Sequence, residues 1–172
     1  MPDGSNLMHC HYVFTVKRKS DGSIEKFKAR LVADGNTQKH GVDFDRIFSS
    51  TVKATTIRLV LAIAAAHDYN LTSIDIRQAY LQAKLDQKLY MRPPPDVHPY
   101  DAKGNPLVCL LKRSLYGLKQ AGREWALLFT SFLMSWGFAR SSVDPCLYMY
   151  EDKMGHHLWV LVYVDDGLLC DN

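Results

Sequence analysis

The sequence predicts a mixed α+β fold in which an antiparallel sheet carries helices on one face. Three observations favour it. An apolar β-type run, residues 158–164, leads into an acidic pair at 165–166 and then a second apolar run. Residues 11–34 alternate on both sides of a turn. Residues 55–67 are an Ala-rich apolar run that begins at threonines, and residues 120–136 have apolar side chains at helical spacing. Strands and helices mixed along one chain in this order favour an α+β architecture.

The composition is that of one globular domain, or a piece of one. Of 172 residues, 47% are hydrophobic and 23% are charged, which excludes a disordered chain. The longest uncharged apolar run, Leu59–Ala66, is too short to span a bilayer, and residues 1–6 lack the features of a signal peptide. The cysteines stand singly, which fits a reduced intracellular chain: Cys10, Cys109, Cys146 and Cys170. The run His9-Cys10-His11 lacks the spacing of zinc ligands and is expected to begin a strand.

Charge is distributed unevenly along the chain. Residues 1–60 hold ten Lys and Arg against six Asp and Glu, residues 61–125 hold nine against six, and residues 126–172 hold two against six. A basic front and an acidic end suggest that one part binds a polyanion and the other binds metal cations.

Residues 11–34 are predicted to form a hairpin, with strands at His11–Lys19 and Ile24–Ala33 and a turn at 20–23. The period of two gathers five cations on one surface: Lys17, Lys19, Lys26, Lys28 and Arg30. This surface either binds an anion or is a solvated edge that uses Lys to prevent aggregation.

The middle of the chain is predicted to alternate helix and strand. After a loop at 35–54, Thr55 or Thr56 should cap a helix that ends near His67 and, being apolar nearly all round, is buried. Strands are expected at 71–76, 107–112 and 146–150, a short helix at 77–82, and a proline-rich loop at 91–106. The helix at 120–136 carries six large apolar side chains at helical spacing, expected in the core rather than as a base-stacking platform: Trp125, Leu128, Phe129, Phe132, Leu133 and Trp136.

Three aspartates are candidates for chemistry. Asp75 lies between two β-branched residues near the end of a predicted strand, where it either needs a partner for its carboxylate or caps the following helix. Asp165 and Asp166 lie at the tip of a predicted strand–turn–strand hairpin. A rigid, exposed tip suits metal ligands, although Asp-Asp-Gly is also ordinary turn chemistry.

Over residues 11–172 the chain resembles the reverse transcriptase of copia-type LTR retrotransposons, the RNA-dependent DNA polymerase domain of a gag-pol polyprotein. Four segments in the family's order carry the resemblance: Lys28-Ala29-Arg30-Leu31-Val32-Ala33, Ser73-Ile74-Asp75-Ile76-Arg77-Gln78-Ala79-Tyr80-Leu81, Leu111-Lys112-Arg113-Ser114-Leu115-Tyr116-Gly117-Leu118-Lys119-Gln120-Ala121 and Tyr163-Val164-Asp165-Asp166. A lone Tyr-x-Asp-Asp is a weak signal, whereas four segments together are specific.

The resemblance implies a reverse-transcriptase palm with partial fingers, truncated before the thumb. Residues 1–10 are then a tail and 11–172 the reverse transcriptase domain. Within that domain, the implied fingers are residues 11–60 and 84–115, and the implied palm is residues 61–83 and 116–172.

The resemblance also implies the roles of individual residues. Asp75 and Asp165 match the catalytic carboxylates, with Asp166 in support, and the metal ligands are Asp75, Ile76 and Asp165. Tyr80 matches the aromatic residue that excludes a 2′-hydroxyl and so selects deoxynucleotides. The other implied nucleotide-binding residues are Lys17, Lys19, Lys28, Arg30, Tyr116, Gly117 and Gln120.

The implied cofactors are two Mg²⁺ ions, with Mn²⁺ as the alternative, because phosphoryl transfer needs charge neutralised on the attacking and leaving oxygens. The implied partners are an RNA or DNA template with its primer, deoxynucleoside triphosphates and the rest of a gag-pol polyprotein, without a membrane. The implied location is intracellular, in a cytoplasmic virus-like particle, with the nucleus as the alternative.

The chain also departs from the family. Asp34 and Asn36 stand where the family usually has Lys and an aromatic residue, and Ser50 stands where it commonly has Pro. The chain ends six residues after Asp166, so we expect a fragment of a polyprotein or a degenerate reading frame.

Two other hypotheses are carried forward. One is a catalytically inactive nucleic-acid-binding remnant of such a polyprotein. The other is a metal-dependent nuclease that would draw further carboxylates from Asp43, Asp45 and Asp144. Convergence of Asp75 with Asp165 and primer extension by the chain discriminate among the three.

Overall fold

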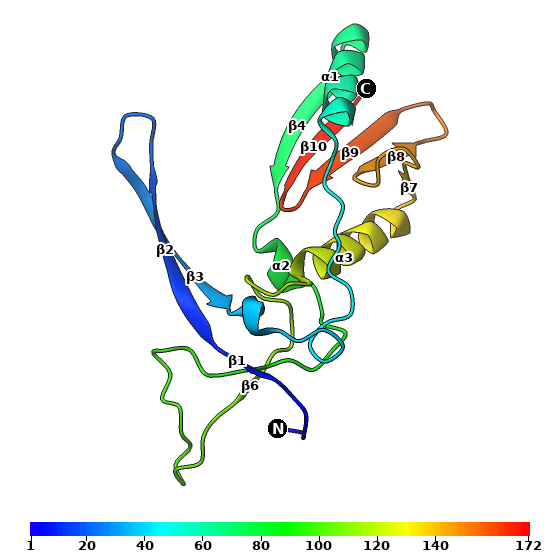
Figure 1. The fold of residues 1–172 in the computed structure, drawn as a ribbon. Helices are drawn as coiled ribbons and strands as arrows, with labels where there is room; N and C mark the ends of the chain where they lie inside the picture. The colour runs from blue at the N-terminus through cyan, green and yellow to red at the C-terminus, as the bar shows by residue number, and fades with distance from the viewer. The chain divides into compact units, whose positions relative to one another are not determined.

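The chain forms two compact units, each assembled from two separate segments. The structure, a computed structural model, describes residues 1–172 (Figure 1). The first unit comprises Met1–Ile47 and Tyr80–Glu124, and the second comprises Phe48–Ala79 and Trp125–Asn172. The predicted α+β class is confirmed. None of the helices combines the length and the apolar character that a membrane-spanning helix requires.

The second unit is built on a five-stranded antiparallel sheet with the strand order β4-β10-β9-β8-β7. The strands are β4 (Asn70–Asp75), β7 (Ala139–Arg140), β8 (Leu147–Glu151), β9 (His157–Tyr163) and β10 (Asp166–Asp171). The hairpin of β9 and β10 therefore lies inside the sheet, with β4 along the outer side of β10. This confirms the predicted strand–turn–strand hairpin. The turn is Val164–Asp165, one residue earlier than predicted, and Asp166 is the first residue of β10.

Two helices cover opposite faces of this sheet: α1 (Ala54–His67) and α3 (Ala121–Ser135). Val60 of α1 packs with Leu161, whereas Leu133 of α3 packs with Val160, the neighbouring residue of β9. Successive residues of a strand point to opposite faces. The prediction that the helices lie on one face is therefore wrong. The reason is that β9 is apolar at successive positions, so both of its faces need cover.

The start of α1 is capped by a distant carboxylate. The helix begins at Ala54 after Lys53, which makes no side-chain cap, so the predicted Thr55 or Thr56 cap is wrong. Instead Asp144 is buried beside it and accepts hydrogen bonds from the backbone N–H of Lys53 at 2.9 Å and of Cys146 at 3.0 Å. The helix start is thereby tied to the segment before β8.

The helices are less buried than their composition predicted. In α1 only the stripe of Thr56, Val60 and Ala64 is buried. In α3 Trp125 and Leu133 are buried, but Phe132 is 51% exposed, and Trp136, just beyond the helix, is 68% exposed. The core prediction is wrong for these outer side chains, because each helix meets the sheet along one stripe only. Gly137, at φ +89°, follows the end of α3 as predicted.

The first unit contains the predicted hairpin, with β2 (Cys10–Arg18) paired to β3 (Ile24–Ala33). Lys17 faces Lys26 across the ladder, so these cations share one face. The other face is apolar and open, with Phe14 75% and Phe27 72% exposed.

A small three-stranded sheet completes the first unit. β1 (Leu7–Met8) pairs in parallel with β5 (Tyr90–Met91), which pairs with β6 (Cys109–Leu110). Met8 is fully buried in a core with Leu89 and Met91, so residues expected to form a tail contribute to this unit. The predicted strand at 107–112 is reduced to β6. The remaining short elements are a 3₁₀ turn at Gly35–Thr37 and α2 at Ala79–Gln82.

We predict that Asp144→Asn destabilises the chain in a pH-dependent way. Burial raises the pKa of Asp144, but hydrogen bonds from Thr56, Lys53 and Cys146 outweigh it and hold the pKa below its ordinary value of 3.8. The stabilisation is therefore present above that pH and is lost as the pH falls through the folded-state pKa. The free energy of unfolding at pH 7 should fall by about 1–3 kcal/mol, because an amide NH₂ then faces backbone donors.

Urea denaturation of the wild type and the variant at pH 7 and pH 3 measures this difference. Asp3→Asn, an exposed substitution, is the control. An equal loss at both pH values would contradict an ionised cap.

Candidate active site

The turn between β9 and β10 carries the acidic pair. Tyr163 and Asp166 are the closing pair of the hairpin, which leaves Val164 and Asp165 as a two-residue loop. Val164 has φ +60°, whereas Asp165 has no positive φ, as in a II′-type hairpin turn, for which Gly is the usual first residue. This conformation could not be predicted from the sequence, because a β-branched residue rarely adopts it.

The pairing of β10 with β4 brings Asp75 to the same place. Asp166 is the direct partner of Asp75 in the antiparallel ladder, and the N–H of Ile76 donates to the carbonyl of Asp165 at 2.7 Å. Facing residues have Cβ atoms about 5 Å apart. The three predicted catalytic residues are thus gathered at one end of adjacent strands, together with the proposed ligand Ile76.

Asp75 is not a helix cap. The following helix, α2, begins only at Ala79, and Gln78 before it is left-handed at φ +56°. Asp75 is the last residue of β4 and is exposed. The capping alternative for Asp75 is therefore wrong.

The close approach of β4 and β10 depends on Gly167. A Cβ at this position would lie 2.7 Å from Cγ1 of Ile74 and 3.3 Å from the carbonyl oxygen of Leu161. Such contacts would push β4 away from β10. Gly167 therefore allows β4 to pack closely against β10 beside the acids, and its role is more than that of a residue after a turn.

The acids form an anionic site without a cationic side chain as partner. Asp75, Asp165 and Asp166 are exposed, and no ion pair joins any of them to Lys, Arg or His. No group of three or more Asp, Glu, His or Cys side chains is arranged to hold a metal ion. Mg²⁺ takes oxygen ligands and is usually held by one or two carboxylates plus substrate phosphates. The donor type and the number of acids here fit that pattern.

In the first unit, three predicted nucleotide-binding residues lie in a row. The guanidinium carbon of Arg30 lies 5.9 Å from the ring centre of Tyr116, and the rings of Tyr116 and Tyr80 meet edge to face with centres 5.4 Å apart. The three come from β3, the loop before α3, and α2. This row combines a cation for phosphate with aromatic surface for a sugar or base.

Gly117 fixes the position of Tyr116 in this row. The carbonyl of Tyr116 accepts a hydrogen bond from the N–H of Ala33 at 2.8 Å. Gly117 has φ +89°, and a Cβ on it would lie 2.1 Å from the carbonyl oxygen of Ala33. Only glycine lets the loop approach the end of β3 so closely.

Gln120 lies inside this unit and supports it through hydrogen bonds. Its Nε2 donates to the carbonyl of Asp43 at 2.8 Å, and its Oε1 accepts from Gln38 Nε2 at 3.0 Å. Both ends of the buried amide are therefore used by the protein. Its predicted contact with a nucleotide remains a prediction.

The remaining cations lie further along the hairpin. Arg30 faces Val13 and Lys28 faces Thr15, whereas Lys17 faces Lys26 four residues beyond Val13. At about 3.3 Å per residue, Lys17 lies about 13 Å from the Arg30 end. Lys19 lies beyond the end of β2. The structure therefore brings Arg30, but not Lys17 or Lys19, to the tyrosine row.

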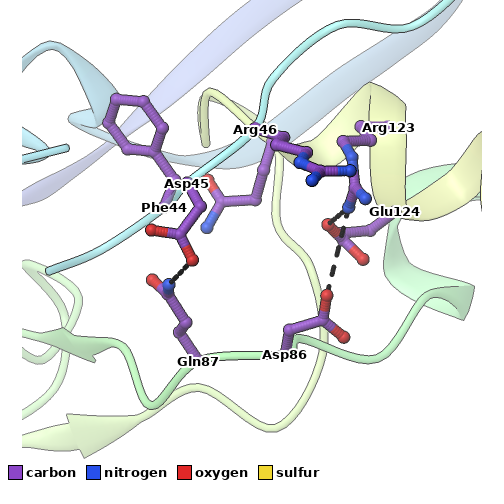
Figure 2. Close-up of a pocket in the computed structure, with 8 residues that line it drawn as sticks. Phe44, Asp45, Arg46, Asp86, Gln87, Arg123 and Glu124 are labelled. Carbon is purple, nitrogen blue, oxygen red and sulfur yellow. Dashed lines mark hydrogen bonds and ion pairs between the residues drawn. The ribbon is translucent and has the colours of Figure 1, made fainter. Parts of the chain in front are cut away.

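A cavity of about 430 Å³ lies elsewhere in the first unit (Figure 2). Arg123 pairs with Glu124 at 2.8 Å and reaches Asp86 at 4.0 Å, while Gln87 donates to Asp45 at 2.8 Å. Burial raises the pKa of Glu124 and the Asp86 carboxylate raises it further, which Arg123 opposes without reversing. Two residues of its lining were predicted site residues, Gln120 for a nucleotide and Asp45 for the nuclease hypothesis. The lining is Phe44, Asp45, Arg46, Asp86, Gln87, Gln120, Arg123 and Glu124.

The acids proposed for a nuclease have structural roles. Asp43 is buried and accepts from Lys39 N–H at 2.8 Å and from Asn6 Nδ2 at 2.7 Å. Asp144 caps α1, and Asp45 binds Gln87. None of the three is available to join Asp75, so the nuclease hypothesis loses its additional ligands.

Comparison with known proteins identifies the family. Residues 1–172 match the sequence profile described as reverse transcriptase (RNA-dependent DNA polymerase). The chain belongs to the reverse transcriptase family. The resemblance to copia-type Pol polyproteins is confirmed by relatives of that kind.

The chain is 39% identical over 169 residues to the Retrovirus-related Pol polyprotein from transposon TNT 1-94 of Nicotiana tabacum, a match that covers 98% of this chain. It is 37% identical over 171 residues, 99% of the chain, to the corresponding polyprotein from transposon RE2 of Arabidopsis thaliana. The Transposon Ty1-BL Gag-Pol polyprotein of Saccharomyces cerevisiae is 34% identical over 148 residues, 80% of the chain. These matches span 13%, 12% and 8% of the three polyproteins. No solved structure matches the chain.

We predict that Gly117→Ala destabilises this reverse transcriptase chain far more than Gly104→Ala. Both glycines have φ above +80°, so the backbone strain is matched at about 1 kcal/mol. A Cβ at Gly104 meets nothing within 4 Å, whereas at Gly117 it meets the Ala33 carbonyl. The extra loss for Gly117→Ala should reach about 2–4 kcal/mol, measured by urea denaturation. Equal losses would show that the loop can move away from β3.

Proposed function

We propose that this reverse transcriptase chain is a fragment of a copia-type Pol polyprotein that carries out RNA-directed DNA polymerisation. In this reaction the 3′-hydroxyl of a primer attacks the α-phosphorus of a deoxynucleoside triphosphate, a new P–O bond forms, and pyrophosphate leaves. The observation that supports it best is the pairing of Asp166 with Asp75 across β4 and β10, with Asp165 tied to Ile76 beside them.

In this proposal the palm is residues 61–83 and 116–172, which include the three acids, and the fingers are residues 11–60 and 84–115. Asp75 and Asp165 hold the metal ions together with the carbonyl of Ile76, and Asp166 supports their charge. Two Mg²⁺ ions, or Mn²⁺, supply charge neutralisation at the attacking and leaving oxygens when they are bound. The exposed position of the acids leaves room for phosphate oxygens to complete the ligand set.

The first unit is proposed to hold the nucleotide. Arg30 binds phosphate oxygens by charge-assisted hydrogen bonds, with Lys28 beside it on β3. Tyr80 lies against Tyr116, and this contact fixes its ring as a barrier to a 2′-hydroxyl. Lys17 and Lys19, further along the hairpin, contact the phosphate backbone of the template–primer, and that binding should be salt-sensitive.

The partners follow from the chemistry: an RNA or DNA template with its primer, deoxynucleoside triphosphates and the rest of a gag-pol polyprotein. The proposed location is an intracellular, cytoplasmic particle, with the nucleus as the alternative.

One alternative is a remnant that binds nucleic acid without turnover. It is favoured by Asp34, an acid near the end of β3 that pairs with His11 at 2.7 Å instead of extending the cationic face.

We predict that Asp75→Asn and Asp165→Asn each reduce primer extension by at least about 10³-fold, because each removes one anionic metal ligand. The measurement is extension of a labelled primer on an RNA template with Mg²⁺ or Mn²⁺. Asp171→Asn, at the opposite end of β10, is the matched control and should keep wild-type activity. Extension by either active-site variant would refute the metal assignment, and no extension by the wild type together with retained RNA binding would establish the remnant.

We predict that Tyr80→Val relaxes discrimination against ribonucleotides by about tenfold, which corresponds to roughly 1.4 kcal/mol. Tyr80→Phe keeps the ring and should keep the discrimination. Tyr100→Val, an exposed tyrosine of the proline-rich loop, is the control for general loss of aromatic surface. Single-nucleotide incorporation of matched deoxy- and ribonucleotides measures the ratio, and an unchanged ratio in Tyr80→Val would remove this residue from the sugar site.

A further inference from the structure

We infer that Trp125 is a positioning residue for the acidic turn, acting through the backbone of Val164 on the carboxylate of Asp165. This inference rests on the proposed function. The sequence placed Trp125 in the core, and it is indeed only 5% exposed. Its polar atom, however, is directed to the residue that precedes the acidic pair: Nε1 donates to the carbonyl oxygen of Val164 at 2.6 Å.

Val164 is held in a conformation that its side chain disfavours. Three non-glycine residues have positive φ, namely Asp68, Gln78 and Val164, and only Val164 is β-branched. A residue of this kind in the left-handed region costs about 1–3 kcal/mol and persists only where the surroundings enforce it. The strained residue directly precedes Asp165, so any relaxation of its backbone reorients that carboxylate.

Two hydrogen bonds from different elements enforce the turn. The Val164 carbonyl accepts from Trp125 of α3, and the Asp165 carbonyl accepts from Ile76, which follows β4, at 2.7 Å. Both carbonyls of the two-residue loop are therefore fixed from outside the hairpin. A change of the turn to an unstrained type would rotate the Val164 carbonyl away and leave a buried indole N–H without an acceptor, which costs about 1–3 kcal/mol.

Trp125 is itself rigidly placed. Its ring lies against Phe129, with ring centres 5.2 Å apart, on the helix that packs against β8 and β9. The indole thus transmits the position of α3 to the turn. An ordinary core tryptophan would contribute only packing. Replacing Trp125 by phenylalanine removes the indole N–H but keeps most of the apolar ring, and so distinguishes a positioning role from packing alone.

The first test uses Trp125→Phe with Trp136→Phe as the control, since Trp136 is exposed and makes no hydrogen bond to the turn. Hydrogen exchange of peptides covering residues 163–167 should accelerate about tenfold in Trp125→Phe and stay unchanged in Trp136→Phe. The affinity for Mn²⁺, titrated without nucleotide, should fall about tenfold. In primer extension kcat should fall about tenfold while KM for the nucleotide changes less than twofold.

The second test adds Val164→Gly, because glycine adopts positive φ without strain. In the Val164→Gly background, Trp125→Phe should change both the exchange rate and the Mn²⁺ affinity by less than twofold. Equal effects in both backgrounds, or a lower melting temperature with unchanged exchange at the turn, would overturn the inference.

The metal-free exchange measurement keeps the two proposals apart. A wild-type chain that binds no more Mn²⁺ than Asp165→Asn does contradicts the proposed function. If the hydrogen-exchange rate at the turn is the same in Trp125→Phe as in the wild type, the positioning role is contradicted, whether or not metal binds.

Discussion

The register of β10 between β4 and β9 is the constraint on which the site depends. Asp166 faces Asp75 on one side and Tyr163 on the other. Because the side chains of a strand alternate, a slip of one residue would exchange the two faces of β10. Cys170 would then leave the core beneath α1, and the acids would separate. The packing of both sheet faces therefore sets the geometry of the carboxylates.

The acidic end of the sheet contains two locally unfavourable features. Asp75 and Asp166 face each other with Cβ atoms about 5 Å apart, so their carboxylates repel each other, and water screens this repulsion because both are exposed. Val164 adds the strain of its left-handed backbone. These costs are offset by the core on each side of β9, formed by α1 and α3. A stable scaffold that carries a locally destabilising site is common in proteins whose activity requires groups or conformations that lower stability.

The sequence predicted elements that repeat a pattern over many residues and missed those that depend on distant partners. The β2–β3 hairpin follows from alternation and turn residues, whereas β4 and the β9–β10 hairpin follow from short apolar, β-type runs beside turn residues. β1 and β7 have two residues each, too few to show a period. The cap of α1 comes from Asp144, 91 residues from Lys53, so local capping rules pointed to the wrong residue. Likewise, the adjacency of Asp75 and Asp166 was reached through family motifs, because no local pattern states which strands pair.

Under the proposed function, the repulsion at the acidic end becomes a means of binding. Asp75 and Asp165 come from segments far apart in the chain, so their arrangement exists only in the folded state. A ligand that binds only the folded state stabilises it by mass action, by about 2.7 kcal/mol at a hundredfold excess over its dissociation constant. A divalent ion held by these carboxylates would therefore offset the repulsion that the register of β10 imposes, and the same register that brings the acids together would prepare the chain for the metal.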